Sequence, residues 1–540
     1  MKRLLLTLLF PSILSFAQTK DYKNFDKAVK YNKQGNIEKS IKYANKALEK
    51  NPDWSQPNLL LASIYANKKQ IKSAADYLLK VYNENDPDDK KGIEQLAKLY
   101  YSNGFYDEAL FYLQKIEGLD TTQYKFTNQI ARYIANCNFA IEAIKNPIEF
   151  KVRNLGSNIN SDNEEYLPAI SVDGKTLVYS RRFMKDNILQ EDFFISEKDA
   201  SNAWSQSMPY GDNLNTYGNE GAFSFSANKN IAVFTACDRD DRLGRCDLYL
   251  LIDGRAVNAG KVINSQEWDS QGCFSPDGKY LYFVSSRKGG YGGKDIWRSQ
   301  ITKNGFLEPE NLGASINTKH DEMSPFLHPD NLTFYFASDG HVGMGDYDIY
   351  ISRRKNNLES WGVPVNIGYP INTHNIENSL VVDNDGKTAY YTSDISGFGL
   401  EDIFVFDLPE NMQADEISEL ELEIITQKTG EEVVLKNVIF AFNSYALEKS
   451  SFVELDRLIV YLKKNPNLEI EIQGHTDDVG NDRENQILSE QRANVVFEYL
   501  TYRVNNTLKH KGFGESFPLE NNDTEEGRAI NRRTSFVIIQ

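Results

Sequence analysis

Two oppositely charged residues near the C-terminal end, Asp477 and Arg492, have a spacing that suits joint recognition of a ligand. Apolar and polar residues alternate over 469–473, which predicts a half-buried strand. Apolar residues then recur at helical spacing over 487–500, so a helix is expected to begin near Asp482. Such a strand–loop–helix unit can fold the carboxylate of Asp477 and the guanidinium of Arg492 into one cleft. The alternative interpretation is an internal salt bridge without a ligand.

The elements around this unit predict a small α/β domain. They are a strand at 438–442, an amphipathic helix at 450–464, the unit described above, and closing strands at 508–512 and 534–539. The predicted order is therefore β-α-β-α-β-β, an α/β sandwich over residues 437–540.

The same residues carry a family resemblance. The string T-D-x-x-G begins at Thr476, N-x-x-L-S-x-x-R-A follows from Asn485, and N-R-R stands at 531–533. This pattern resembles the signature of OmpA-like peptidoglycan-binding domains. The resemblance implies non-covalent recognition of diaminopimelate in the peptidoglycan stem peptide, without catalysis.

By this resemblance, Asp477 binds the ammonium group of diaminopimelate and Arg492 binds its carboxylate. Opposite charges in one cleft match a zwitterion, and a guanidinium can bind a carboxylate through two parallel hydrogen bonds. The other candidate ligand-binding residues are Thr476, Asn485, Asn443 and Arg532.

Composition sets limits on the rest of the chain. A chain of 540 residues exceeds one ordinary hydrophobic core, so about three domains are expected. The net charge of −17 and the isoelectric point near 5.0 argue against a nucleic-acid partner, which would need a basic face. None of the six histidines forms an H-E-x-x-H or H-x-H motif, and we expect neither a metal nor a cofactor.

The first seventeen residues have the pattern of an export signal. Lys2 and Arg3 precede an apolar run, and Ala17 ends a small-residue cleavage site. The alternative is a short membrane anchor, but the run is too short to span a bilayer. We therefore expect residues 1–17 to be removed during export to the periplasm.

Export would place the four cysteines in a compartment where disulfides can form. Cys237 and Cys246 flank a predicted strand–turn–strand, and a disulfide between them suits an oxidising compartment. Two buried free thiols are the alternative. None of the four cysteines has the spacing of a metal site.

Residues 21–146 show a helical repeat of about 34 residues. Small residues, turn glycines and a terminating proline recur at Ala28, Gly35, Ser40, Ala47 and Pro52, then at Ala62 and Ala74, then at Ala97, Gly104 and Ala109. The pattern resembles tetratricopeptide repeats (TPRs), which implies an all-α solenoid whose concave face binds a protein segment. The alternative is a solenoid that only packs against the next domain.

Residues 148–408 contain a second repeat. Its copies open at Asn160, Asn215, Asn264, Asn317 and Asn372, with steps of 55, 49, 53 and 55 residues. A turn follows 13 residues after each asparagine, between two short strands, and an acidic residue opens a third strand. Ser275-Pro276-Asp277-Gly278 is the clearest turn and resembles the PD40, or TolB-like, propeller repeat. The pattern predicts an all-β, five-bladed propeller.

The repeated Asn and Asp residues are interpreted as turn formers and strand-start hydrogen bonders, and not as ligands. The fifth copy lacks an outer strand after Phe406, and the segment 150–156 has a matching sequence. We therefore expect 150–156 to complete the fifth blade. The acidic stretch 409–436 is expected to be a linker, with a short strand at 420–425 as the alternative for part of it.

Two functional classes follow. The order of helical repeat, propeller and wall-binding domain resembles the periplasmic peptidoglycan-binding component of type IX secretion in Bacteroidota. This resemblance implies a non-catalytic periplasmic scaffold that is associated with the outer membrane and cell wall and carries protein partners on its repeats. The alternative is a propeller-containing enzyme that acts on cell-wall sugar or peptide. No G-x-S-x-G motif follows the propeller, so we expect no enzyme.

Overall fold

The computed structural model describes residues 20–85, 89–117, 127–211, 213–394, 398–427, 430–440 and 444–539. The expected export signal at 1–17 and the candidate ligand residue Asn443 lie outside these residues. The chain divides into two compact units. The first holds the helices up to Ile148 together with His341–Asp348 and Gly368–Glu377, and the second holds the remainder.

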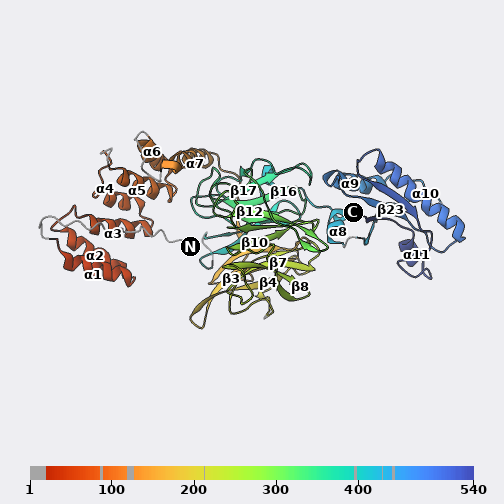
Figure 1. The fold of residues 1–540 in the computed structure, drawn as a ribbon, viewed down its shortest axis with the longest axis horizontal. Coiled ribbons are helices and arrows are strands. Elements are labelled where there is room, and N and C mark those ends of the chain that lie inside the picture. The colour runs from red at the N-terminus through yellow and green to blue at the C-terminus, as the bar shows by residue number, and fades with distance from the viewer. Residues whose placement is uncertain are drawn as a thin grey trace. The chain divides into compact units, whose positions relative to one another are not determined.

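Helices make up the N-terminal part of the first unit (Figure 1). They are α1 (Tyr22–Lys33), α2 (Ile37–Leu48), α3 (Ser55–Asn67), α4 (Ile71–Leu79), α5 (Lys90–Tyr101), α6 (Tyr106–Glu117) and α7 (Thr127–Lys145). Each helix packs on the next one along the chain. The repeated small residues lie at these contacts: Ala28 is fully buried, and its carbonyl accepts a hydrogen bond from Ser40 Oγ (2.9 Å). Within the described residues, no helix is both long enough and apolar enough to cross a membrane.

Antiparallel sheets form the middle of the second unit, shown from yellow to cyan in Figure 1. The first has β2 (Glu164–Ile170), β3 (Thr176–Lys185), β4 (Ile188–Glu197) and β5 (Met208–Pro209). The second has β6 (Asn219–Phe225), β7 (Ile231–Cys237), β8 (Cys246–Ile252) and β9 (Arg255–Asn258). A disulfide between Cys237 and Cys246 joins β7 to β8.

The next three sheets repeat this plan. The third has β10 (Asp269–Phe274), β11 (Tyr280–Ser285), β12 (Asp295–Thr302), β13 (Gly305–Phe306) and β14 (Glu310–Asn311). The fourth has β15 (Glu322–Leu327), β16 (Thr333–Ser338), β17 (Asp348–Arg353) and β18 (Val365–Asn366). The fifth has β19 (Val381–Val382), β20 (Thr388–Ser393), β21 (Asp402–Asp407) and, from upstream, β1 (Arg153–Asn154). Arg153 pairs with Val405, so the expected addition of segment 150–156 to the fifth repeat is confirmed.

The repeated turn and asparagine residues have the predicted structural roles. The second turn residue has a positive φ in every copy: Gly174 (66°), Lys229 (57°), Gly278 (67°), Asn331 (57°) and Gly386 (69°). The amide of Asn215 accepts a hydrogen bond from Phe193 N (2.8 Å) and donates one to Phe193 O (3.0 Å). The same two-bond pattern joins Asn264 to Leu248, Asn317 to Ile296, and Asn160 to Ile403. Asn215, Asn264 and Asn317 therefore each bind the third strand of the preceding sheet, and Asn160 binds the corresponding strand of the fifth sheet.

A buried acid follows each asparagine by five residues, a regularity that is visible in the sequence but that we did not predict. These acids are Glu165, Glu220, Asp269, Glu322 and Glu377. Each accepts hydrogen bonds from the backbone N–H and hydroxyl of the Ser or Thr that follows its asparagine. In the first three sheets an arginine also pairs with the acid: Arg181 (2.6 Å), Arg239 (3.2 Å) and Arg287 (2.8 Å).

The acidic stretch expected to be a linker contains ordered elements, so the boundary predicted at residue 437 is too late. Helix α8 (Glu419–Thr426) begins with a capping box between Ser418 and Glu421. Leu420 and Ile424, four residues apart, bury one face of α8 in the C-terminal core. Strand β22 (Glu432–Val434) then joins the C-terminal sheet.

The C-terminal domain, blue in Figure 1, departs from the predicted element order in two places. Of the strand expected at 438–442, the described residues 438–440 hold only an isolated bridge between Phe440 and Leu447. A short helix, α11 (Glu525–Asn531), was not predicted; Thr524 caps it by accepting a hydrogen bond from Gly527 N (3.0 Å). The observed order is β-α-β-α-β-α-β. Its remaining elements are α9 (Ser451–Lys464), β23 (Ile470–Gly474), α10 (Asp482–Thr501), β24 (Leu508–Gly512) and β25 (Thr534–Ile538).

Glu322, the buried acid of the fourth sheet, is expected to make the stability of the fold depend on pH. Burial raises the pKa of Glu322 from 4.5 to about 7, so the folded state favours its protonated form. The contribution of Glu322 to stability is fully present below about pH 4.5, where the residue is protonated in the folded and unfolded states, and is lost as the pH rises through about 7. We expect the contribution to the free energy of unfolding to fall by about 3 kcal/mol across that range.

Thermal denaturation of Glu322→Gln at a series of pH values checks this expectation. The variant should lose most of the decline between about pH 4.5 and about pH 7, whereas the exposed Glu308→Gln should keep it. A decline of equal size in both variants would rule out Glu322 as its source.

Candidate functional site

The predicted strand–loop–helix unit is present as β23, a loop and α10, and close packing determines its geometry. The sheet order is β22-β25-β23-β24, with β23 and β24 parallel and Gly474 paired with Gly512. A Cβ atom on Gly474 would lie 2.1 Å from the carbonyl oxygen of Ser489, and one on Gly512 would lie 2.3 Å from the backbone nitrogen of Glu490. The two glycines therefore let α10 approach the ends of both strands.

The loop after β23 places Thr476 and Asp477 at this junction. Thr476 N donates to the carbonyl of Gly514 (2.9 Å), and Asn485 Nδ2 donates to the carbonyl of Asp477 (3.2 Å). Asn485 also donates to the carboxylate of Glu515 (2.6 Å). Asn485, near the start of α10, therefore fixes the loop by its hydrogen bond to the backbone of Asp477. Thr476 Oγ1 is buried and has no hydrogen-bond partner within the described residues.

The carboxylate of Asp477 already forms a salt bridge with a second arginine of the site, Arg532. Arg532 Nη1 lies 2.7 Å from Asp477 Oδ2, and Arg532 Nη2 lies 2.8 Å from Glu525 Oε1. The side chain of Asp477 is 10% exposed and that of Arg532 is 37% exposed. The hydrogen bond to Asp477 raises the pKa of Arg532. Glu525, which belongs to the unpredicted helix α11, is therefore part of the site.

Arg492 on α10 is buried and retains unused donors. Its Nε donates to the carbonyl of Ser444 (3.1 Å), and its guanidinium lies 5.0 Å from the ring centroid of Phe440. Within the described residues, Nη1 and Nη2 make no hydrogen bond and Arg492 has no salt bridge. Burial lowers the pKa of Arg492, and the charge of Asp477 acts in the opposite direction. The two charges therefore interact across the site.

The structure brings together five of the six residues proposed as ligand-binding: Thr476, Asp477, Asn485, Arg492 and Arg532. The neighbouring Arg533 has a different role. Its Nε lies 2.6 Å from Glu432 Oε1 on β22, and its side chain is 4% exposed. Burial and the charge of Arg533 lower the pKa of the adjacent His475. Arg533 therefore links β22 to the start of β25, and its carbonyl accepts a hydrogen bond from His475 N after β23 (2.9 Å).

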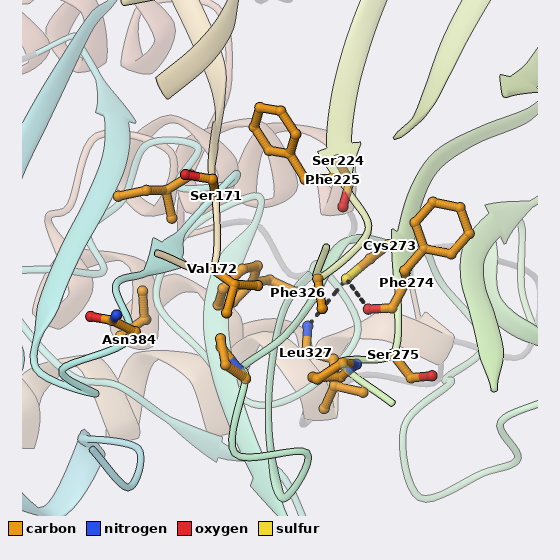
Figure 2. A pocket seen from close by; sticks show the side chains of 15 residues that line it. Ser171, Val172, Ser224, Phe225, Cys273, Phe274, Ser275, Phe326, Leu327 and Asn384 are labelled. Carbon is orange, nitrogen blue, oxygen red and sulfur yellow. Dashed lines mark hydrogen bonds between the residues drawn. The ribbon is translucent and has the colours of Figure 1, made fainter. Parts of the chain in front are cut away.

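A cavity lies among the antiparallel sheets, and its lining comes from the first strand, or the turn after it, of each sheet (Figure 2). The lining residues labelled in Figure 2 include Val172, Phe225, Cys273, Phe326 and Asn384. Cys273 Sγ accepts a hydrogen bond from Leu327 N (3.4 Å). Burial raises the pKa of Cys273 to about 11, so its thiol stays protonated near neutral pH. The lining is largely apolar and offers no activated nucleophile.

Comparison with known proteins places the C-terminal site in a family. Residues 439–532 match the model of the OmpA family. The C-terminal domain is OmpA-like. Outer membrane porin F of Pseudomonas aeruginosa is 41% identical over 100 residues, which cover 18% of this chain and 29% of porin F.

Two further proteins are similar over the same part of the chain. The peptidoglycan-binding protein ArfA of Mycobacterium bovis is 34% identical over 103 residues, which cover 19% of this chain and 32% of that protein. The chain therefore spans less than a third of the length of either curated relative. The crystal structure of the peptidoglycan-associated lipoprotein from Burkholderia pseudomallei is 31% identical, with 19% of this chain and 87% of that chain covered and a TM-score of 0.18.

The close approach of α10 predicts that Gly474→Ala damages the site through the backbone. The added methyl group would overlap the Ser489 carbonyl, so α10 must move away from β23. We expect a loss of about 2 kcal/mol or more in the free energy of unfolding of the C-terminal domain, measured by denaturant titration. Gly221→Ala is the control, because its nearest neighbour would be Ser180 Oγ at 3.4 Å. Equal midpoints for Gly474→Ala and the wild-type protein would refute the packing argument.

Proposed function

We propose that the C-terminal domain binds peptidoglycan non-covalently through the diaminopimelate of the stem peptide. The observation that carries this proposal is the combination of a buried carboxylate on Asp477 with a buried guanidinium on Arg492 whose Nη1 and Nη2 donors are unused within the described residues. Diaminopimelate presents an ammonium and a carboxylate on one carbon. The Nη atoms of Arg492 suit that carboxylate, and Asp477 suits the ammonium.

The relatives support this assignment over a structural salt bridge. ArfA is by its name a peptidoglycan-binding protein, and it matches the segment that contains the site. In a purely structural pair, Arg492 would be expected to hydrogen-bond Asp477 directly. Instead, the direct partner of Asp477 is Arg532, and Arg492 contacts a carbonyl and a ring.

We further propose that the other parts of the chain form a scaffold. The packing of each helix on the next supports a TPR solenoid. Contacts of β2 with β6, β6 with β10, β10 with β15, and β2 with β20 support a ring of five propeller blades, as does the cavity lined by every sheet. Solenoid and propeller surfaces would then hold protein partners while the C-terminal domain holds the wall.

The cellular setting of this scaffold is part of the proposal. The export pattern at 1–17, the disulfide and the OmpA-like domain support a periplasmic protein that is associated with the outer membrane and cell wall. The order of the three parts supports a role in anchoring an outer-membrane or type IX-like secretion assembly to peptidoglycan.

Co-sedimentation with purified sacculi that contain diaminopimelate tests the proposal. The wild-type protein should pellet with the sacculi, and Asp477→Asn and Arg492→Gln should each reduce binding by about tenfold or more, because each removes one charge-assisted contact. Glu308→Gln, far along the chain in an exposed position, is the control for charge change. Undiminished binding by both site variants would exclude this site.

Arg532 should behave differently from Arg492. Because Arg532 contacts Asp477 in the free protein, the ligand ammonium must displace it or share the carboxylate. We therefore expect Arg532→Gln to bind free meso-diaminopimelate as tightly as the wild-type protein or a few-fold more tightly, measured by isothermal titration calorimetry. Loss of binding as large as that of Asp477→Asn would instead make Arg532 a direct ligand-binding residue.

A further inference from the structure

The first four helices carry a charge opposite to that of the whole chain. Residues 20–80 contain thirteen lysines, no arginine and six acidic residues, a net charge of +7, whereas the whole chain has −17. All thirteen lysines are exposed. Between residues 20 and 80, all of which the structure describes, no salt bridge includes any of them. Solvated helix faces usually interleave both signs, so this excess of one sign points to an anionic partner.

Stacked tyrosines join the two helices of each successive pair. With the distance between ring centroids, the stacks are Tyr31–Tyr43 (5.4 Å), Tyr65–Tyr77 (5.4 Å) and Tyr100–Tyr112 (5.8 Å). Lysine ammonium groups lie over these rings: Lys27 and Lys46 over Tyr43, Lys39 over Tyr31, Lys80 over Tyr77, and Lys115 over Tyr112. Their distances to the centroids run from 4.5 to 5.7 Å. Cation–π contacts thus hold positive charge close to each stack before any partner arrives.

The third stack already holds a carboxylate from this chain. Tyr112 Oη donates to Glu84 Oε2 (2.7 Å), and Lys115 Nζ donates to the carbonyl of Glu84 (3.3 Å). The first two stacks lack such an occupant: within the described residues, the hydroxyls of Tyr31, Tyr43, Tyr65 and Tyr77 make no hydrogen bond. The same combination of tyrosine hydroxyl and lysine therefore holds a hydrogen-bonded carboxylate at the third stack, whereas within the described residues no carboxylate is hydrogen-bonded to the hydroxyls of the first two stacks.

We propose that the Tyr31–Tyr43 and Tyr65–Tyr77 stacks bind an acidic segment of another protein, with a carboxylate side chain at each stack in the way that the third stack binds Glu84. The lysines over the rings supply the charge, and the tyrosine hydroxyls supply directed hydrogen bonds. This surface is separate from the wall-binding site and gives the scaffold a partner of defined chemistry.

Two other polyanions fit the same helices less well. A lipid surface requires an exposed apolar helix face, but between residues 20 and 80 the exposed large apolar side chains are Tyr22 and Leu79. A single-stranded nucleic acid stacks its bases on free aromatic faces, whereas these tyrosine rings already stack on each other. Both polyanions are included in the test.

Fluorescence anisotropy of labelled poly-L-glutamate with the purified protein tests the proposal. The site variant is Lys27→Gln, Lys46→Gln and Lys80→Gln together. The control, Lys30→Gln, Lys42→Gln and Lys72→Gln, changes the same net charge on the same helices with lysines that lie over no ring. We expect about tenfold weaker binding for the site variant and less than about threefold for the control. Tyr43→Phe with Tyr77→Phe, which keeps the rings and removes the hydroxyls, should also weaken binding several-fold.

Equal losses in the two lysine variants would overturn the proposal, because charge density alone would then explain binding. An unchanged affinity in the tyrosine variant, or tighter binding of phosphatidylglycerol vesicles or poly(U) RNA than of poly-L-glutamate, would overturn it as well. Circular dichroism verifies the fold of each variant. Sacculus binding should be unaffected throughout, so failure here is distinguishable from failure of the wall-binding proposal.

Discussion

The C-terminal site depends on how closely α10 can approach the sheet. Gly474 and Gly512 are paired on the adjacent strands β23 and β24. A side chain at either position would overlap the backbone of α10, at Ser489 or Glu490. Because the helix lies this close, Asn485 can hold the loop that carries Asp477 by its backbone, and the charge of Asp477 acts on the guanidinium of Arg492. The charges proposed to recognise a ligand are therefore positioned by a steric condition at residues that carry no charge.

The same domain separates ionic groups that hold the fold from ionic groups that remain available. Arg533, which precedes β25 and is 4% exposed, pairs with Glu432 on β22, which is 24% exposed, so removing Glu432 would leave a buried guanidinium without its charged partner. Asp477 instead pairs with the half-exposed Arg532, which has a second partner in Glu525. An exchangeable partner keeps the buried carboxylate neutralised without closing the site to another cation.

Local signals in the sequence predicted the parts of the structure that depend on local chemistry. The turns, the asparagines and the added strand β1 follow from residue types at fixed spacing, and these were anticipated. Helix α11 was missed because its seven residues are too few to show periodicity, and its cap, Thr524, sits in a loop-like run. Helix α8 was not predicted because it lies in a glutamate-rich stretch typical of a linker and its short apolar run also suits a strand, although Leu420 and Ile424 hold its buried face. Glu525 could not enter the predicted site without α11.

Two binding functions at the ends of one chain have a physical consequence beyond their separate affinities. In the proposed scaffold, a wall-bound C-terminal domain would confine the basic helices near the wall, and an acidic partner held at the same wall would meet them at a raised effective concentration. The charge of +7 on residues 20–80, within a chain of −17, attracts acidic proteins to these helices while the remainder repels them. This uneven charge favours encounters in which an acidic protein approaches the basic helices. The effect weakens at higher salt, because screening shortens the range of the interaction. Carboxylate contacts at the tyrosine stacks are short-ranged and persist where that steering is screened, so they, and not net charge, would determine which acidic segment stays bound.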